Sequence, residues 1–296
     1  MSELAVVRKK IRIKFDRVFD MVQALLNEPR GAIGVTIVLV IVVCAAFAPW
    51  IAPHRPYEQN IMERFEGPSF RHLLGTDYLG RDLFSRLIFG ARVAVAVAFG
   101  SVAISIFLGT LTGLLAAYSG GVVDQCFLLI FDIIRAFPSI ILVLTLVAVV
   151  GSSLLNIILV IAFTTFPYYG RIARAQTLAT KEEEYISAAE SLGVRTRELL
   201  LRHFLPNIVT PIIVTGGMDL ASYIMWEAGL SFLGLGVQPP TASWGIMLKN
   251  GYSYVQSSVW MIVWPSAALA ISMLGCSLFA ESLQAALNPM ERSSHE

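Results

Sequence analysis

The sequence predicts an all-α integral membrane protein with six transmembrane helices. Of its 296 residues, 56% are hydrophobic and only 15% are charged, whereas soluble domains carry about 25% charged residues. The mean hydropathy is +0.68. The hydrophobic residues also come in blocks of about 20, which is long enough to cross a hydrocarbon core at roughly 1.5 Å per residue.

Six hydrophobic blocks predict the spans in chain order. They cover residues 31–53, 91–118, 125–150, 154–175, 207–233 and 259–287. The first block is longer than the roughly 7–15 apolar residues of a signal-peptide core, so we expect it to be retained. The sequence therefore divides into an N-terminal tail (1–30), a first transmembrane helix (31–53), a loop (54–90), a five-helix core (91–287) and a C-terminal tail (288–296).

The distribution of Lys and Arg predicts which side of the membrane each connection faces. Six spans put both tails on one side, together with the connection between the fourth and fifth spans. Fourteen Lys and Arg residues lie on this side and six on the other. Since cytoplasmic loops carry the excess of positive charge, we expect both termini to be cytoplasmic and the loop 54–90 to be extracytoplasmic.

The cytoplasmic loop 176–206 is too long to be a simple turn. Its part KEEEYISAAESLGVRTRELLLRHFLP (181–206) predicts two amphipathic helices joined at Gly193. One face of the first helix carries Tyr185, Ala188, Ala189 and Leu192. The two alanines would let another protein approach the backbone closely. The alternative is an ordinary amphipathic helix that lies on lipid.

This loop resembles the hallmark loop of permease subunits of ATP-binding-cassette (ABC) importers. The family pattern is Glu-Ala-Ala, three residues, Gly, nine residues, Ile, any residue and Leu-Pro. It aligns here with Ser187, Ala188, Ala189, Gly193, His203, Leu205 and Pro206. Ser187 and His203 depart from the pattern, but the Gly and Leu-Pro spacings fit together.

Two further segments narrow the resemblance to the peptide branch, which includes dipeptide, oligopeptide and nickel permeases. They are LLGTDYLGRDLFSRLIFGAR (73–92) and AGLSFLGLGVQPPTASWGIML (228–248). With the ending RHFLPN (202–207), the similarity covers roughly residues 30 to 289. The chain thus resembles members of this family over nearly its whole length.

The resemblance implies a type I ABC importer permease architecture with a cytoplasmic coupling helix. It also implies several partners in a prokaryotic inner membrane: a second homologous permease, two cytoplasmic ATPases and an extracytoplasmic solute-binding protein. ATP and Mg²⁺ would be held by the ATPases, and this chain would bind no cofactor. The residues expected to contact an ATPase are Glu184, Tyr185, Ser187, Ala188, Ala189, Gly193, Leu205 and Pro206.

The sequence itself gives no sign of an enzyme, a metal site or a nucleic-acid partner. The phosphate-binding pattern GxxxxGK[ST] is absent, as are GxSxG and HExxH. The histidines, His54, His72, His203 and His295, are widely spaced, so we expect no metal cluster. A net charge of +1 gives no basic field for nucleic acid.

Several charged residues fall inside the predicted spans, where a charge is costly, and four of them form two candidate pairs. Asp132 and Arg135 are three residues apart and could form an ion pair on one helix face. Asp219 and Glu227 lie about 80° apart around the fifth span, so both could border one cavity. There they would attract a peptide's ammonium group or a cationic solute. Hydrogen bonding between helices is the alternative.

A different class of function also fits the spans. A stand-alone channel or an ion-coupled secondary transporter would need no ATPase, and its segment 181–206 would merely lie on the membrane. The two hypotheses differ in what a bulky residue at Gly193 does: the importer would lose its ATPases, and the stand-alone transporter would be unaffected.

Overall fold

The structure is a computed structural model and describes residues 25, 26 and 28–287. Five long helices dominate it: α2 (Pro29–Ala46), α4 (Leu83–Ser119), α7 (Leu154–Lys181), α10 (Leu205–Leu233) and α12 (Trp260–Leu287). The shorter elements are α3 (Ala48–Ile51), η1 (Ile61–Glu63), α5 (Gly121–Arg135), α6 (Ser139–Val150), α8 (Glu184–Ser191), α9 (Thr196–Leu199), the π-helical turn η2 (Leu200–Phe204) and α11 (Trp244–Ser253). Within the described residues, strand-like pairing is confined to one isolated bridge between Thr76 and Asp82.

The five long helices are each long and apolar enough to cross a membrane. A sixth span is formed if α5 and α6 are counted together, although they are bent by 86° at residues 136–138. The sequence predicted one span over residues 125–150, and the structure has a full break within it. The reason is that proline lacks a backbone N–H and disfavours helical backbone at the preceding residue, Phe137.

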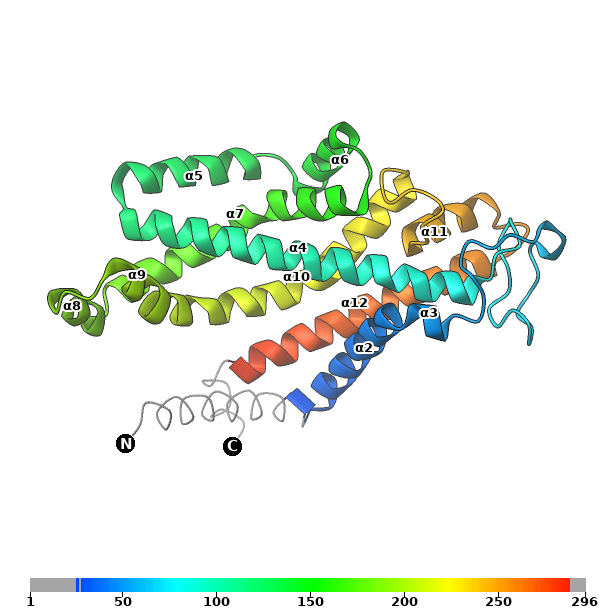
Figure 1. The fold of residues 1–296 in the computed structure, drawn as a ribbon, viewed down its shortest axis with the longest axis horizontal. Coiled ribbons are helices and arrows are strands. Elements are labelled where there is room, and N and C mark those ends of the chain that lie inside the picture. The colour runs from blue at the N-terminus through cyan, green and yellow to red at the C-terminus, as the bar shows by residue number, and fades with distance from the viewer. Residues whose placement is uncertain (1–24, 27, 288–296) are drawn as a thin grey trace.

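The long helices run roughly along the long axis of the molecule (Figure 1). The most extensive contact joins α4 to α7, and α12 packs along α2 on one side and α10 on the other. Gly109 and Gly113 of α4 allow its close approach to α7: a Cβ at Gly113 would lie 2.2 Å from the carbonyl oxygen of Gly170. These two glycines form a GxxxG pattern, which typically lets helices pack closely.

Most connections lie toward the two ends of the bundle, whereas the break between α5 and α6 lies between the ends (Figure 1). α8 and α9 lie at one end, while α3, the segment 52–82 and α11 lie at the other. The predicted loop 54–90 ends earlier, because Asp82 accepts a hydrogen bond from the backbone N–H of Ser85 and so caps α4 at Leu83. The N-terminal tail up to residue 24 and the tail 288–296 lie outside the described residues.

Candidate functional site: a central polar cavity and the exposed helix α8

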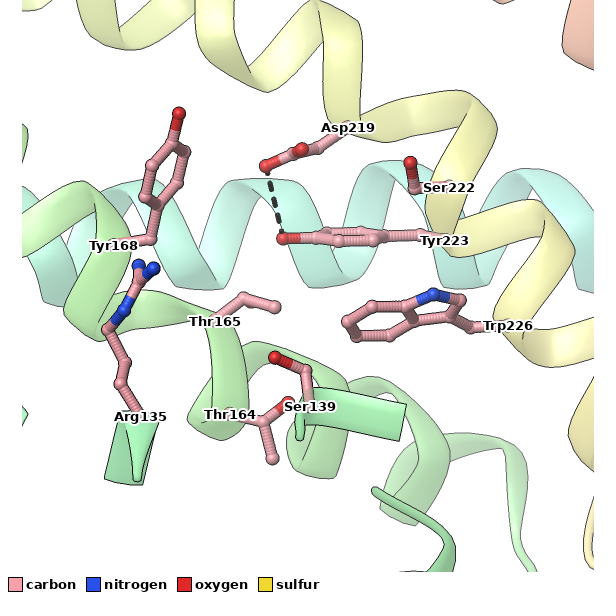
Figure 2. A pocket seen from close by; sticks show the side chains of 9 residues that line it. All are labelled: Arg135, Ser139, Thr164, Thr165, Tyr168, Asp219, Ser222, Tyr223 and Trp226. Atoms are coloured by element: carbon pink, nitrogen blue, oxygen red, sulfur yellow. Dashed lines mark hydrogen bonds between the residues drawn. The ribbon is translucent and has the colours of Figure 1, made fainter. Parts of the chain in front are cut away.

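A polar cavity of about 270 Å³ lies halfway along α7 and α10 (Figure 2). The break between α5 and α6 supplies its remaining wall. The lining residues are Arg135, Ser139, Thr164, Thr165, Tyr168, Asp219, Ser222, Tyr223 and Trp226. Hydroxyl, carboxylate and guanidinium groups therefore meet at a depth where apolar side chains dominate the helices. Polar groups so placed commonly mark the path of a substrate or an ion.

Two tyrosine hydroxyl groups hold Asp219 in the cavity wall. The fully buried Tyr169 of α7 donates a hydrogen bond of 2.6 Å to Asp219 Oδ2. Tyr223, one turn along α10, donates a longer one of 3.5 Å to the same oxygen (Figure 2). Both hydrogen bonds end on Oδ2 and neither uses Oδ1. The carboxylate is thus anchored through one oxygen while the residue lines the cavity.

Arg135 and Asp132 do not form the ion pair that their spacing predicted. Asp132 instead pairs with Arg171 of α7. The Arg135 guanidinium lies over the ring of Tyr168, 5.4 Å from the ring centroid (Figure 2). The physical reason is the break after α5: Arg135 is the last residue of that helix, so its side chain reaches the cavity and Tyr168, whereas Asp132 lies nearly one turn earlier and meets Arg171.

Glu227 does not line this cavity. It is 1% exposed, and its Oε1 accepts a hydrogen bond of 2.6 Å from Ser231 Oγ on the same helix. The cavity therefore contains one of the two carboxylates that the sequence placed at a shared site. Glu227 lies eight residues along α10 from Asp219, and this separation carries it beyond the cavity.

α8 stands at one end of the bundle and packs through a single narrow stripe. Ile186 and Ala189 are buried in a cluster with Leu199, Phe204 and Ile208. Tyr185, Ser187, Ala188 and Leu192 are exposed, and Leu192 keeps 84% of its surface accessible. The expectation that Ala188 and Ala189 share the outer face is therefore wrong: Ala189 faces the protein because it follows Ile186 by three residues.

Gly193 ends α8 with a left-handed backbone conformation, at φ +74°. The N–H of Gly193 donates to the carbonyl of Glu190, and the N–H of Val194 donates to that of Ala189. These two hydrogen bonds form a Schellman motif, in which glycine is preferred because it has no Cβ. A Cβ at this position would meet no atom within 4 Å, so the need for glycine comes from the backbone.

The remaining residues of the predicted loop surround α8. Glu184 is its first residue, and the Tyr185 hydroxyl accepts a hydrogen bond of 2.7 Å from Asn207 Nδ2. Leu205 and Pro206 begin α10, directly after the π-helical turn η2. π-Helical turns of this kind often occur at functional sites. The structure thus brings the residues of the predicted loop together at one end of the molecule.

Two groups of charged residues were not found from the sequence. Arg174 Nε and Nη2 each lie 2.6 Å from an oxygen of Asp124, a bidentate pair that joins α7 to α5. His54 and His72 lie near Asp82, with ligand atoms within 4.8 Å of one another. The expectation that the histidines are too scattered to cluster is wrong for these two, because the chain between them folds back onto the start of α4.

Two protein-family models match the chain. Residues 105–293 match the binding-protein-dependent transport system inner membrane component. Residues 19–68 match the N-terminal transmembrane domain of oligopeptide transport permease C. The first match includes both the cavity and α8, and the second covers the first span.

Curated relatives align over most of their length. The dipeptide transport system permease protein DppC of Alkalihalophilus pseudofirmus is 37% identical over 88% of this chain and 86% of its own. The di/tripeptide transport system permease protein DppC of Pseudomonas aeruginosa is 39% identical over 88% of each chain. The probable D,D-dipeptide transport system permease protein DdpC of Escherichia coli is 35% identical over 97% of this chain and 96% of its own.

The fold also matches a solved structure. The crystal structure of an amino acid ABC transporter with histidines has a TM-score of 0.50, with 18% identity over 71% of this chain and 94% of that chain. At this identity the likeness concerns the fold alone. The family models and the relatives show that the chain belongs to the binding-protein-dependent transport permeases and is a multi-pass membrane permease subunit of an ABC importer.

Proposed function

We propose that this chain forms one half of the translocation pathway of an importer for peptides. A second, homologous permease would complete the pathway, and an extracytoplasmic binding protein would deliver the solute. Two cytoplasmic ATPases would bind ATP with Mg²⁺ and hydrolyse it, so this chain would hold no cofactor and catalyse no reaction. The relatives named above, which are dipeptide, di/tripeptide and D,D-dipeptide permeases, support the substrate class.

The cavity around Asp219 is the observation that carries this proposal. An unblocked peptide has an ammonium group at one end and a carboxylate at the other. Asp219 offers a negative charge to the ammonium group, and Arg135 offers a positive charge from the facing wall. Tyr168 and Trp226 add aromatic surface that tolerates many side chains. Such a cavity suits a solute recognised by its two ends.

α8 is the proposed contact with an ATPase. Its outer face exposes Tyr185, Ala188 and Leu192, while Ile186 and Ala189 attach it to the ends of the long helices. A force on α8 is therefore transmitted to α4, α7 and α10, which contribute to the same buried cluster. Two of these helices, α7 and α10, also line the cavity. ATP binding would shift the pathway between inward-open and outward-open states in this way.

The orientation follows from the same proposal. α8 lies at the cytoplasmic end of the bundle, and both termini are cytoplasmic, as the excess of Lys and Arg on that side supports. The segment 52–82 then lies at the extracytoplasmic end, where the binding protein docks.

The test is to purify the tagged chain with its associated proteins and to change the end of α8. Gly193→Val places a β-branched residue where φ is +74°, so the Schellman motif and the direction of the following chain should change. We expect the ATPases to be lost from the purified complex, together with ATP-dependent peptide uptake in proteoliposomes.

Gly151→Val is the matched control. Gly151 also has positive φ, at +92°, but it lies between α6 and α7, away from α8. This variant should keep its ATPases if the effect at Gly193 is local. Uptake by the purified chain alone, without ATP, would contradict the proposal, as would retention of the ATPases by Gly193→Val.

A further inference from the structure

We propose that His54, His72 and Asp82 bind a divalent transition-metal ion of the zinc class at the end of the bundle opposite α8. Asp82 Oδ1 lies 3.0 Å from His72 Nδ1 and 3.8 Å from His54 Nδ1. Zinc binds nitrogen and oxygen at about 2.0–2.2 Å in a tetrahedron, which separates neighbouring ligand atoms by about 3.4 Å. Small rotations of the side chains would therefore place an ion among these three atoms.

One of the three ligand atoms has no other use in the fold. His54 Nδ1 is shielded from solvent and has no hydrogen-bond partner among the described residues. Its distance of 3.8 Å from Asp82 is too long for a hydrogen bond. The rings of His54 and His72 lie with their centroids only 4.8 Å apart. His54 Nδ1 is therefore a shielded nitrogen that faces a carboxylate and a second imidazole. A metal ion bound there would give it the partner that it lacks.

The surrounding contacts orient the three ligands. Glu63 Oε2 lies 3.4 Å from His72 Nε2, so a carboxylate faces the ring nitrogen that would not bind the metal. Such carboxylate partners fix the orientation and tautomer of metal-binding histidines. Ser85 orients the other two ligands: its N–H donates to Asp82 Oδ2 at 2.7 Å, and its hydroxyl accepts from the backbone N–H of His54 at 3.1 Å.

The adjoining cavity has the volume and the charge for a hydrated cation. It measures about 80 Å³, several times what one water molecule needs. It is lined by three carboxylates (Glu58, Glu63 and Asp82) and one guanidinium (Arg71), a net charge of −2 that matches a divalent ion. Imidazole and carboxylate ligands together suit zinc. Three protein ligands would leave the fourth tetrahedral position to water.

The ion would join three parts of the chain that are separate in sequence. His54 follows α3, His72 belongs to the long connection, and Asp82 caps α4. A bound metal would therefore fasten the segment 52–82 to the start of a transmembrane helix. By binding only the folded state, it would also raise the unfolding temperature of the protein.

The experiment measures Zn²⁺ bound to the full-length chain in detergent, purified through a tag without histidine and stripped with a chelator. The expected result is one equivalent of Zn²⁺ per chain and a rise in unfolding temperature on adding it. His54→Gln should abolish both effects. Glu63→Gln, which removes the orienting carboxylate, should weaken Zn²⁺ binding by about 10- to 100-fold.

Glu66→Gln is the matched control, because it removes an exposed carboxylate of the same segment that is not a ligand. It should bind Zn²⁺ like the unaltered chain. The site is also tested without any variant: Co²⁺ is added to the unaltered chain and its absorption spectrum is examined for tetrahedral coordination. Equal Zn²⁺ binding by His54→Gln and the unaltered chain, no binding by either, or an octahedral Co²⁺ spectrum would overturn the proposal.

Discussion

Asp219 brings a negative charge into the cavity. Both tyrosine hydroxyl groups donate to its Oδ2, and Oδ1 takes no part in these contacts. Asp219→Asn keeps the size of the side chain and an oxygen that can accept from Tyr169. It removes the charge and replaces the second acceptor oxygen with an NH₂ donor. We expect KM for peptides with a free amino group to rise about 10- to 100-fold, because a charge-assisted hydrogen bond contributes about 1.5–3 kcal/mol. The measurement is ATP-dependent uptake by the reconstituted complex.

Two comparisons isolate the charge. Peptides with an acetylated amino group lack the ammonium and should show a similar KM with both forms of the protein. Glu227→Gln neutralises a carboxylate on the same helix that is buried outside the cavity, so KM should not change. If Asp219→Asn instead prevents assembly of the complex, the residue stabilises helix packing and does not contact the solute.

How well single residues could be predicted depended on how local their role is. The sequence identified Asp219 because an acidic residue in the middle of an apolar helix is unusual. It could not distinguish Asp219 from Glu227, since helical periodicity describes direction and not position along the bundle axis. Arg135 was paired with the wrong group because its environment depends on the break between α5 and α6. His54 and His72 required the long-range folding of the segment between them.

At the scale of elements, the contact between α4 and α7 depends on glycine. In Gly113→Ala the new Cβ would lie 2.2 Å from the carbonyl oxygen of Gly170, so the helices must separate. Such overpacking costs about 1–3 kcal/mol. We therefore expect a lower unfolding temperature for the purified complex, measured by thermal denaturation in detergent.

Gly229→Ala gives the opposite expectation. Gly229 also lies inside a helix, α10, but a Cβ there would meet nothing within 4 Å. Alanine is more favourable than glycine in a helix by about 1 kcal/mol, so this variant should be as stable as the unaltered chain or more so. Equal destabilisation by both substitutions would show that close packing at Gly113 is not the cause.

The elements themselves were predicted well where their signal is local. Four of the six hydrophobic blocks became single long helices, although α4 and α7 extend beyond the apolar residues. The first block is divided at Phe47 into α2 and α3, and the third is broken between α5 and α6. Apolar length predicts the part of a helix that lipid can cover, but not its continuation beyond the membrane. α8 was found from its helical spacing. Its buried face was not, because the packing of Ile186 and Ala189 is set by other helices.

At the scale of the whole molecule, the two ends differ in a way that fits opposite sides of a membrane. α8, α9 and most of the Lys and Arg residues of the connection between the fourth and fifth spans occupy one end. The other end holds a segment fastened by buried polar contacts: Arg81 Nε donates to Asp77 at 2.7 Å, and Arg86 donates to the carbonyl of Pro56 at 2.9 Å. A folded segment of this kind would give the proposed binding protein a preformed surface.

Accessibility of single cysteines to a membrane-impermeant maleimide would test the orientation. After replacing Cys44 and Cys126, Phe70→Cys and Ser187→Cys each place a thiol at an exposed position, one at either end of the bundle. In intact cells that lack the binding protein, Phe70→Cys should react and Ser187→Cys should react only after the membrane is permeabilised. Cys276 is buried and, left in place, should stay unlabelled in both conditions. The reverse pattern would place α8 outside the cell, where no ATPase could reach it.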